Sequence, residues 1–184
     1  MAILDSGDRT EFATGAVRDM QEGKGRCDLL PLDVVSYIKT VAPFKNATDE
    51  NIAKVFGYIH EFTQSGKHFC LVKALNAFVN IENSFGRWST MYLEVSVHFE
   101  DGAKKYGENN WQKGIPVSCY INSGVRHYLK WIRGDEDERH DRAFCWNMLC
   151  AIWTCMNKPE LNEYAKRVTE SDTICGETAD AAGE

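Results

Sequence analysis

Apolar residues recur along most of the chain at the three- and four-residue spacing of amphipathic helices. This pattern predicts helices over 29–43, 48–63, 68–81, 88–106, 116–133 and 137–156, followed by a short helix over 159–168. No segment shows the sustained period-two alternation, bounded by hairpin turns, that would predict strands. We therefore predict an all-α fold, a bundle of five to six helices.

The helical pattern divides the chain into three parts. Residues 29–168 form the predicted helical domain, and 169–184, rich in Thr, Ala, Asp, Glu and Gly, are predicted to be a disordered tail. Residues 1–28 form an N-terminal arm in which Lys24 and Arg26 lie among glycines. Such a segment could bind an anion through its cations and backbone amides, or lie across the bundle with its charges in water.

Composition limits the classes of function. A net charge of -6 argues against a nucleic-acid-binding surface, which is usually basic. No apolar run approaches the roughly 20 residues of a membrane span, and the N-terminus lacks a signal-peptide pattern. We expect a cytoplasmic protein with no membrane partner. The seven cysteines include no CxxC pair, so we interpret them as reduced packing residues.

Residues whose side chains could take part in catalysis or ligand binding are concentrated between 86 and 156. Two polar turns, 107–114 and 134–138, separate the three helices predicted there. Carboxylates, imidazoles and cations recur at the helix ends next to these turns: Glu94, His98, Glu100, Lys104, Lys105, Arg126, His127, His140 and Asn147. This composition is typical of a site that holds a divalent metal and phosphate.

The first turn offers groups suited to a nucleobase. Trp111 could stack on a flat ring while Asn110 hydrogen-bonds to its edge. Trp111 could equally close one end of the bundle. On the preceding helix, Glu94, His98 and Lys105 share one face, which is also the pattern of a merely solvated face.

The second turn is acidic over 135–138. Carboxylates at a helix N-terminus are favoured by the macrodipole, which is one explanation. Four in a row would also repel one another unless a cation lay among them, and oxygen ligands in such number favour Mg²⁺ or Mn²⁺ over Zn²⁺. Arg126 beside His127 suits phosphate oxygens because its planar fork is bidentate.

Several motifs together carry a family resemblance. They are 14–19 (TGAVRD), 23–26 (GKGR), 28–31 (DLLP), 98–100 (HFE), 102–107 (GAKKYG), 110–116 (NWQKGIP), Ser123 with Arg126-His127, and Gly134, Asp137-Glu138, His140 and Trp146-Asn147. In order and spacing these resemble a phage family, the MazZ-type dATP/dGTP diphosphohydrolases, which are related to the all-α MazG-like enzymes. Two departures are the lack of the EExxE helix of MazG-like enzymes and Asn122 where an acid is expected.

The resemblance implies hydrolysis of dGTP, and of dATP as a second substrate, to the monophosphate and diphosphate. It also implies a role in shaping the phage nucleotide pool for DNA that contains 2-aminoadenine, in the host cytoplasm. A homodimer or homotetramer is expected, because MazG-like sites are commonly completed by a second chain.

We assign candidate roles on this basis, with Mg²⁺ or Mn²⁺ as the cofactor. The predicted metal ligands are Glu94, Glu100, Asp137, Glu138 and His140. The predicted catalytic residues are Glu94, Glu100, Asp137, Glu138 and His127. The predicted substrate-binding residues are Lys24, Arg26, Lys104, Lys105, Asn110, Trp111, Arg126 and Asn147.

Two alternatives remain open. An HD-type phosphohydrolase is suggested by His140-Asp141 with His98 or His127 upstream, but it would need a further aspartate, and the nearest downstream is Asp172 in the predicted tail. The chain could also be a nucleotide-binding phage protein without turnover.

Overall fold

The computed structural model describes residues 9–19, 47–81 and 88–166. The helices among them are α2 (Ala47–Ser65), α3 (Phe69–Ile81), α4 (Trp88–Tyr106), α5 (Val117–Arg133) and α6 (His140–Asn157), with the 3-10 turns η3 (Asn110–Lys113) and η4 (Pro159–Leu161). The predicted all-α class is therefore confirmed. No helix in these ranges is long and apolar enough to cross a membrane.

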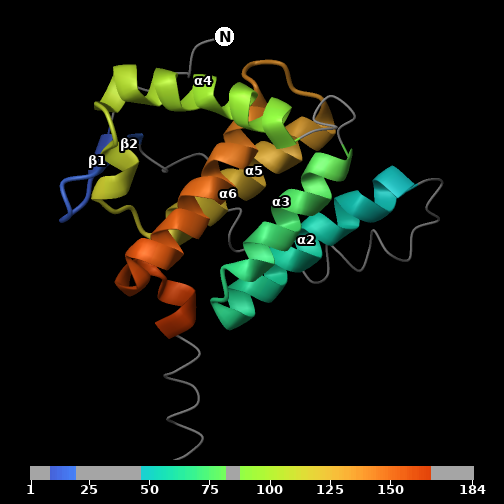
Figure 1. Cartoon of the computed structure of the whole chain (residues 1–184), viewed down its shortest axis with the longest axis horizontal. Helices are drawn as coiled ribbons and strands as arrows, with labels where there is room; N and C mark the ends of the chain where they lie inside the picture. The colour runs from blue at the N-terminus through green and yellow to red at the C-terminus, as the bar shows by residue number, and fades with distance from the viewer. Residues whose placement is uncertain (1–8, 20–46, 82–87, 167–184) are drawn as a thin grey trace, which may run out of the picture.

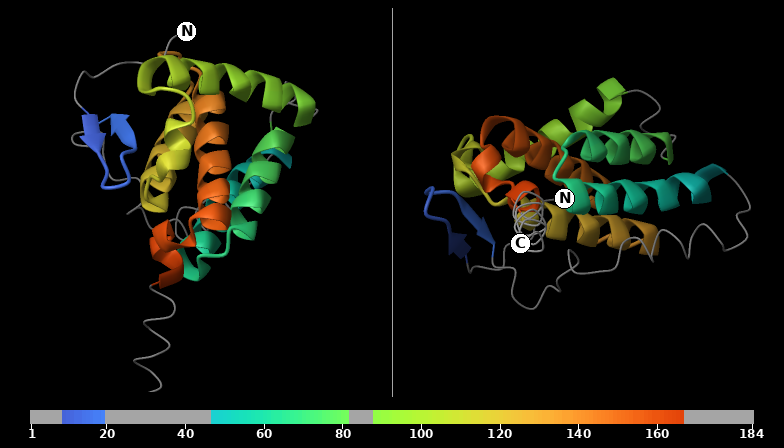
Figure 2. Two further views of the ribbon diagram at one scale, coloured as in Figure 1. Left: turned by 60° about the vertical axis from the view of Figure 1, so that its left-hand side comes forward. Right: turned by 90° about the horizontal axis from the view of Figure 1, so that it is seen from below.

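Two helical hairpins form the body of the bundle (Figure 1). Helix α2 packs on α3, α5 packs on α6, and α3 joins the two pairs by packing against α6. Helix α4 lies across one end of the α5–α6 pair and contacts α6 (Figures 1 and 2). Side chains of α4 therefore line the same pocket as polar side chains of α5 and α6.

An aromatic cluster holds the two hairpins together. The Phe78 ring of α3 lies 4.7 Å from that of Phe144 on α6 and 5.8 Å from that of Tyr128 on α5, measured between centroids. The Phe56 ring of α2 lies 4.9 Å from that of Tyr128. The Tyr128 hydroxyl donates to the backbone oxygen of Ile52 over 3.1 Å, so a fully buried phenol has its acceptor inside the core. All four main helices of the body thus meet at one point.

A small sheet in the N-terminal arm was not predicted. Strands β1 (Arg9–Glu11) and β2 (Val17–Asp19) pair antiparallel, with Thr10 opposite Arg18. Three residues are too short for period-two alternation to appear in the sequence, which explains the omission. The side-chain amide of Asn110 fixes β2 to the bundle: it accepts from the Val17 nitrogen over 3.1 Å and donates to the Val17 oxygen over 2.8 Å.

The predicted start of the last long helix was wrong by one turn. Helix α6 begins at His140 rather than at Asp137. The Asp137 carboxylate instead bridges Lys130, over 2.7 Å, and His140, over 2.7 Å. These bonds hold residues 135–139 outside the helix, and side-chain partners here override helix propensity.

The C-terminal segment is also divided more than predicted. In place of one helix over 159–168, η4 is followed by a helical turn over 163–166. Asn162 donates to the Gly66 oxygen over 2.8 Å, and a Cβ at Gly66 would lie 2.5 Å from Ala165 backbone atoms. The segment therefore docks on the turn between α2 and α3. The predicted 29–43 helix and the tail lie outside the described residues.

We expect Gly124→Val to separate α5 from α6. A Cβ at Gly124 would lie 2.5 Å from the Met148 Cε and 3.4 Å from the Asn147 Cβ, so a branched side chain overpacks this contact. The free energy of unfolding, measured by urea denaturation, should fall by roughly 1–3 kcal/mol.

Gly102→Ala in α4 is the matched control. Its added Cβ meets nothing within 4 Å, so helix propensity alone should raise the free energy of unfolding by about 0.5–1 kcal/mol. Equal effects of the two substitutions would contradict the packing argument.

Candidate functional site

A pocket of about 600 Å³ opens between β2, α4, the following turn, α5 and α6. This volume lies within the range of small-molecule sites. One part of the lining is aromatic and apolar, with Phe99, Trp111 and Ile115. Farther along α5 the lining is polar and charged. Its members there are Ser123, Arg126, His127, Lys130 and, from the α5–α6 connection, Glu138.

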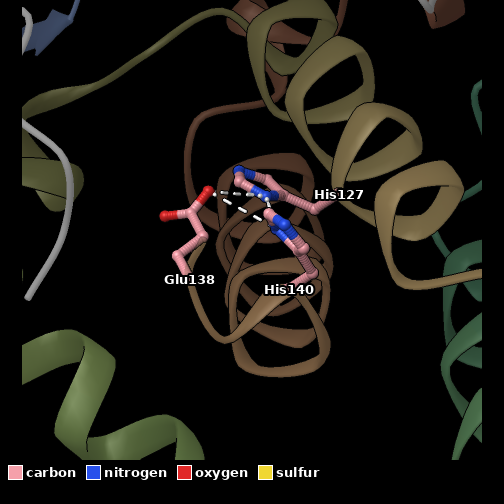
Figure 3. A group of neighbouring side chains, drawn as sticks. All are labelled: His127, Glu138 and His140. Carbon is pink, nitrogen blue, oxygen red and sulfur yellow. Dashed lines mark hydrogen bonds and ion pairs between the residues drawn. The ribbon is translucent and has the colours of Figure 1, made fainter. Parts of the chain in front are cut away.

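Three potential ligand atoms converge at the polar part of this pocket (Figure 3). The Nδ1 atoms of His127 and His140 lie 3.1 Å apart. The Glu138 Oε1 lies 3.1 Å from the His127 Nδ1 and 3.5 Å from the His140 Nδ1. The α5–α6 hairpin brings these side chains together, since His127 is on α5, His140 opens α6 and Glu138 precedes it.

A fourth residue orients this group from outside. The His140 Nε2 lies 2.7 Å from the Asp137 Oδ1, and the other Asp137 oxygen accepts from Lys130. An imidazole that donates Nε2–H to a carboxylate has, when neutral, a lone pair on Nδ1. That lone pair points at the His127 and Glu138 atoms, so the three atoms need a shared proton or a cation between them. Two imidazoles and a carboxylate fit a divalent transition metal better than Mg²⁺.

The protonation states of His127 and Asp137 suit cation binding, whereas burial disfavours the ionised form of Glu138 that a cation would bind. Burial lowers the pKa of His127 well below its ordinary value, and the Arg126 charge acts in the same direction, so this imidazole is neutral at pH 7. Burial raises the pKa of Glu138. Lys130 and then His140 lower the pKa of Asp137 to about 2, which keeps the orienting carboxylate ionised.

The other two predicted metal ligands lie apart from this group. Glu94 receives a hydrogen bond from the Arg142 Nε over 2.7 Å and lies outside the pocket lining. Glu100 lines the pocket but is exposed and paired with Lys104 over 2.5 Å. Their roles as metal ligands stay predictions. Spacing along α4 could not indicate that Arg142 of α6 would face Glu94.

The predicted substrate-binding residues divide in the same way. Asn110, Trp111, Arg126 and Asn147 all line the pocket. Lys104 and Lys105 are outside its lining. Lys105 is instead bonded to Asp19 over 2.9 Å. Lys24 and Arg26 lie outside the described residues.

Two of these residues already have internal partners. Both polar atoms of the Asn110 side chain bond to the Val17 backbone. The Trp111 ring packs between Phe99 and Trp153, at centroid distances of 5.4 and 5.0 Å. Trp111 therefore packs against α4 and α6 and at the same time lines the pocket.

Two pocket residues, Arg18 and Asp19, have no role in the sequence predictions, and His98 has one only in the HD-type alternative. Arg18 and Asp19 reach the pocket only because β2 docks there. The Asp19 carboxylate accepts from the Tyr106 hydroxyl over 2.6 Å as well as from Lys105. Their signal in the sequence was the TGAVRD motif, which periodicity alone could not place.

His98 makes the fold sensitive to pH. Burial lowers its pKa to about 4, with Arg142 and Arg18 adding to the shift while Asp101 opposes it. As the pH falls from about 6.5 toward 4, the unfolded chain takes up a proton that the folded chain does not. The stability associated with a neutral His98 is therefore complete above pH 6.5 or so and decreases below it.

We expect His98→Gln to flatten the pH dependence of stability. Between pH 7 and pH 5, wild type should lose roughly 1–2 kcal/mol more unfolding free energy than the variant. Urea denaturation of both proteins at pH 7, 6 and 5 measures this difference. His127 contributes its own share in both proteins, so the comparison isolates His98. Parallel curves would show that His98 is not held neutral.

Comparison with known proteins adds one match. Residues 88–164 match the family model described as dATP/dGTP diphosphohydrolase, N-terminal. Neither the curated proteins nor the solved structures contain a significant match to the chain. The matched segment runs from the start of α4 through α6 to Tyr164, and so contains Glu138 and both histidines of the converging group. The match supports the dNTP diphosphohydrolase family for this part of the chain.

Proposed function

We propose that the chain hydrolyses purine deoxynucleoside triphosphates, dGTP first and dATP second, to the monophosphate and diphosphate. The observation that carries the proposal is the convergence of His127, Glu138 and His140 at the wall of a pocket of nucleotide size. The family match over 88–164 supports the substrate class.

The proposed cofactor is Mn²⁺, with Mg²⁺ as the weaker candidate. His127, Glu138 and His140 would hold it, because two nitrogens and one oxygen suit Mn²⁺ better than Mg²⁺. When bound, such an ion supplies Lewis acidity toward phosphoryl oxygens and lowers the pKa of coordinated water. Glu100 is the carboxylate of α4 that lines the same pocket and is proposed to assist. Glu94 is proposed to act indirectly, by holding α4 to α6 through Arg142.

The remaining pocket residues supply positioning and charge. Asp137 fixes the His140 ring through the 2.7 Å bond to Nε2. Arg126 and Lys130 line the pocket beside the converging group and would balance phosphate charge. The aromatic wall formed by Phe99 and Trp111 would receive the purine.

The wider role is part of the same proposal. The products would suit a phage nucleotide pool that feeds 2-aminoadenine synthesis in the host cytoplasm. A homodimer or homotetramer is proposed as well, supported by the apolar side chains that α4 exposes. Leu93 is 71% exposed and Tyr92 is 53% exposed.

We expect the purified chain to release diphosphate from dGTP in the presence of Mn²⁺ and to be inactive in EDTA. A panel of the four dNTPs, with chromatographic separation of the products, measures this. Glu138→Gln and His140→Ala should each lower kcat/KM by more than about 100-fold, and Asp137→Asn by about 10- to 100-fold. Titration with Mn²⁺ should show weaker binding by the same variants.

Glu61→Gln on the exposed face of α2 is the matched control and should leave turnover unchanged. Glu94→Gln and Glu100→Gln show whether α4 contributes ligands. Full activity of Glu138→Gln would remove the converging group from the mechanism.

The products also separate the alternatives. Release of intact triphosphate would indicate an HD-type enzyme. In the fold, the Asp141 carboxylate of that motif is bonded to Arg139 over 2.6 Å, which weighs against this alternative. Nucleotide binding without any product would indicate a non-catalytic protein.

A further inference from the structure

Arg18 occupies an unusual position in the pocket. It projects from β2, and its guanidinium carbon lies 5.1 Å from the centroid of the Tyr120 ring and 5.9 Å from that of Trp146. Its Nη2 donates to the Asn147 Oδ1 over 2.8 Å. Its Nη1 is buried and has no hydrogen-bond partner among the described residues.

The charge of this guanidinium has no counter-ion among residues 9–19, 47–81 and 88–166. None of the ion pairs in the described part of the chain includes Arg18, although the acid next to it, Asp19, is engaged by Lys105 and Tyr106. The groups around it are neutral: an amide, an indole and a phenol whose pKa burial raises. Arg18 is only partly buried, but its Nη1 is removed from water without an acceptor, and an anion received by the pocket would supply both that acceptor and the missing charge.

A second unpaired donor close to Arg18 supports the same inference. The indole nitrogen of Trp146 is also buried without a hydrogen-bond partner in the described ranges, and Trp146 lines the pocket. Two neighbouring donors without acceptors call for a ligand group rich in acceptor oxygens.

The geometry of Arg18 favours phosphate over a base edge. Aromatic rings pack near the guanidinium, and the Asn147 Oδ1 accepts a hydrogen bond from its Nη2. The N–H groups of Nη1 are therefore left to donate to a ligand. The guanidinium fork matches the spacing of two phosphate oxygens. A neutral base edge could accept hydrogen bonds but would leave the partly buried charge of Arg18 uncompensated.

The position along the helices separates Arg18 from the converging group. Its partners Tyr120 and Asn147 each lie seven residues from His127 and His140, respectively, which is about 10 Å along α5 and α6. We propose that Arg18 binds one phosphate of the nucleotide's polyphosphate chain, and that His127, Glu138 and His140 hold a different one. This inference rests on the proposed function. The N-terminal hairpin thereby completes a site built mainly from α4 to α6.

Titration calorimetry of the full chain in EDTA with sodium tripolyphosphate, dGTP and deoxyguanosine tests this proposal without requiring turnover. Arg18→Gln should weaken tripolyphosphate and dGTP binding by about 10- to 100-fold and leave deoxyguanosine binding unchanged. Arg18→Lys, which keeps the charge but loses the fork, should give an intermediate loss.

Asn147→Asp is the second variant, because it leaves Arg18 in place and supplies an internal counter-ion. It should weaken tripolyphosphate binding at least about 10-fold if Arg18 serves an anion. Lys73→Gln on α3, which removes one positive charge outside the pocket, should change neither affinity. Thermal melting of each protein checks that the variants are folded.

Equal tripolyphosphate affinity of folded Arg18→Gln and wild type would overturn the proposal, and so would absence of binding to wild type. A loss confined to guanine-containing ligands, deoxyguanosine included, would overturn it in favour of base recognition. Wild type that binds tripolyphosphate through Arg18 but hydrolyses no dNTP would refute the proposed activity and leave the anion site standing.

Discussion

The close packing of α5 on α6 is the constraint on which the rest of the site depends. Gly124 lies at this contact, where an added carbon would lie 2.5 Å from the Met148 Cε and 3.4 Å from the Asn147 Cβ. One turn farther along α5, His127 meets His140 at 3.1 Å. Interiors are packed too densely to absorb small shifts, so the distance between these helices sets the distance between the ligand atoms. The packing of α5 on α6 therefore stabilises the fold and also positions the candidate ligand atoms.

The pocket contains several ionisable groups whose pKa values or hydrogen bonding are perturbed by burial. His98 and His127 are held neutral by burial, the pKa of Glu138 is raised, and the Arg18 Nη1 has no hydrogen-bond partner in the described part of the chain. Ordinary cores avoid such groups. Perturbed groups that cluster at one concave surface are typical of functional sites. In this pocket the carboxylate and imidazoles suit a cation, whereas Arg18 suits an anion, and the proposed metal-bound nucleotide would supply both.

The N-terminal hairpin and the helices that match the family model are joined by side-chain bonds to the backbone. Asn110 gives Val17 the pair of hydrogen bonds that a neighbouring strand would give, and Thr14 donates to the oxygen of Gly114. The Asn110 amide, which the sequence predicts to hydrogen-bond to the edge of a base, thus holds β2 instead. Its effect on the ligand is indirect, because β2 carries Arg18 and Asp19 to the pocket.

The sequence by itself determined where these helices lie, because their apolar periodicity is local: α4 begins and ends at the predicted residues and α5 begins one residue later, although α6 begins three residues later than predicted. It also indicated Glu138, His127 and His140 as chemically important. Only the tertiary structure decided which acids meet them. The sequence does not distinguish Glu94 from Glu138, yet Glu94 faces Arg142 and Glu138 faces two imidazoles. Spacing along one helix states which residues share a face, and the packing of neighbouring helices decides what that face meets.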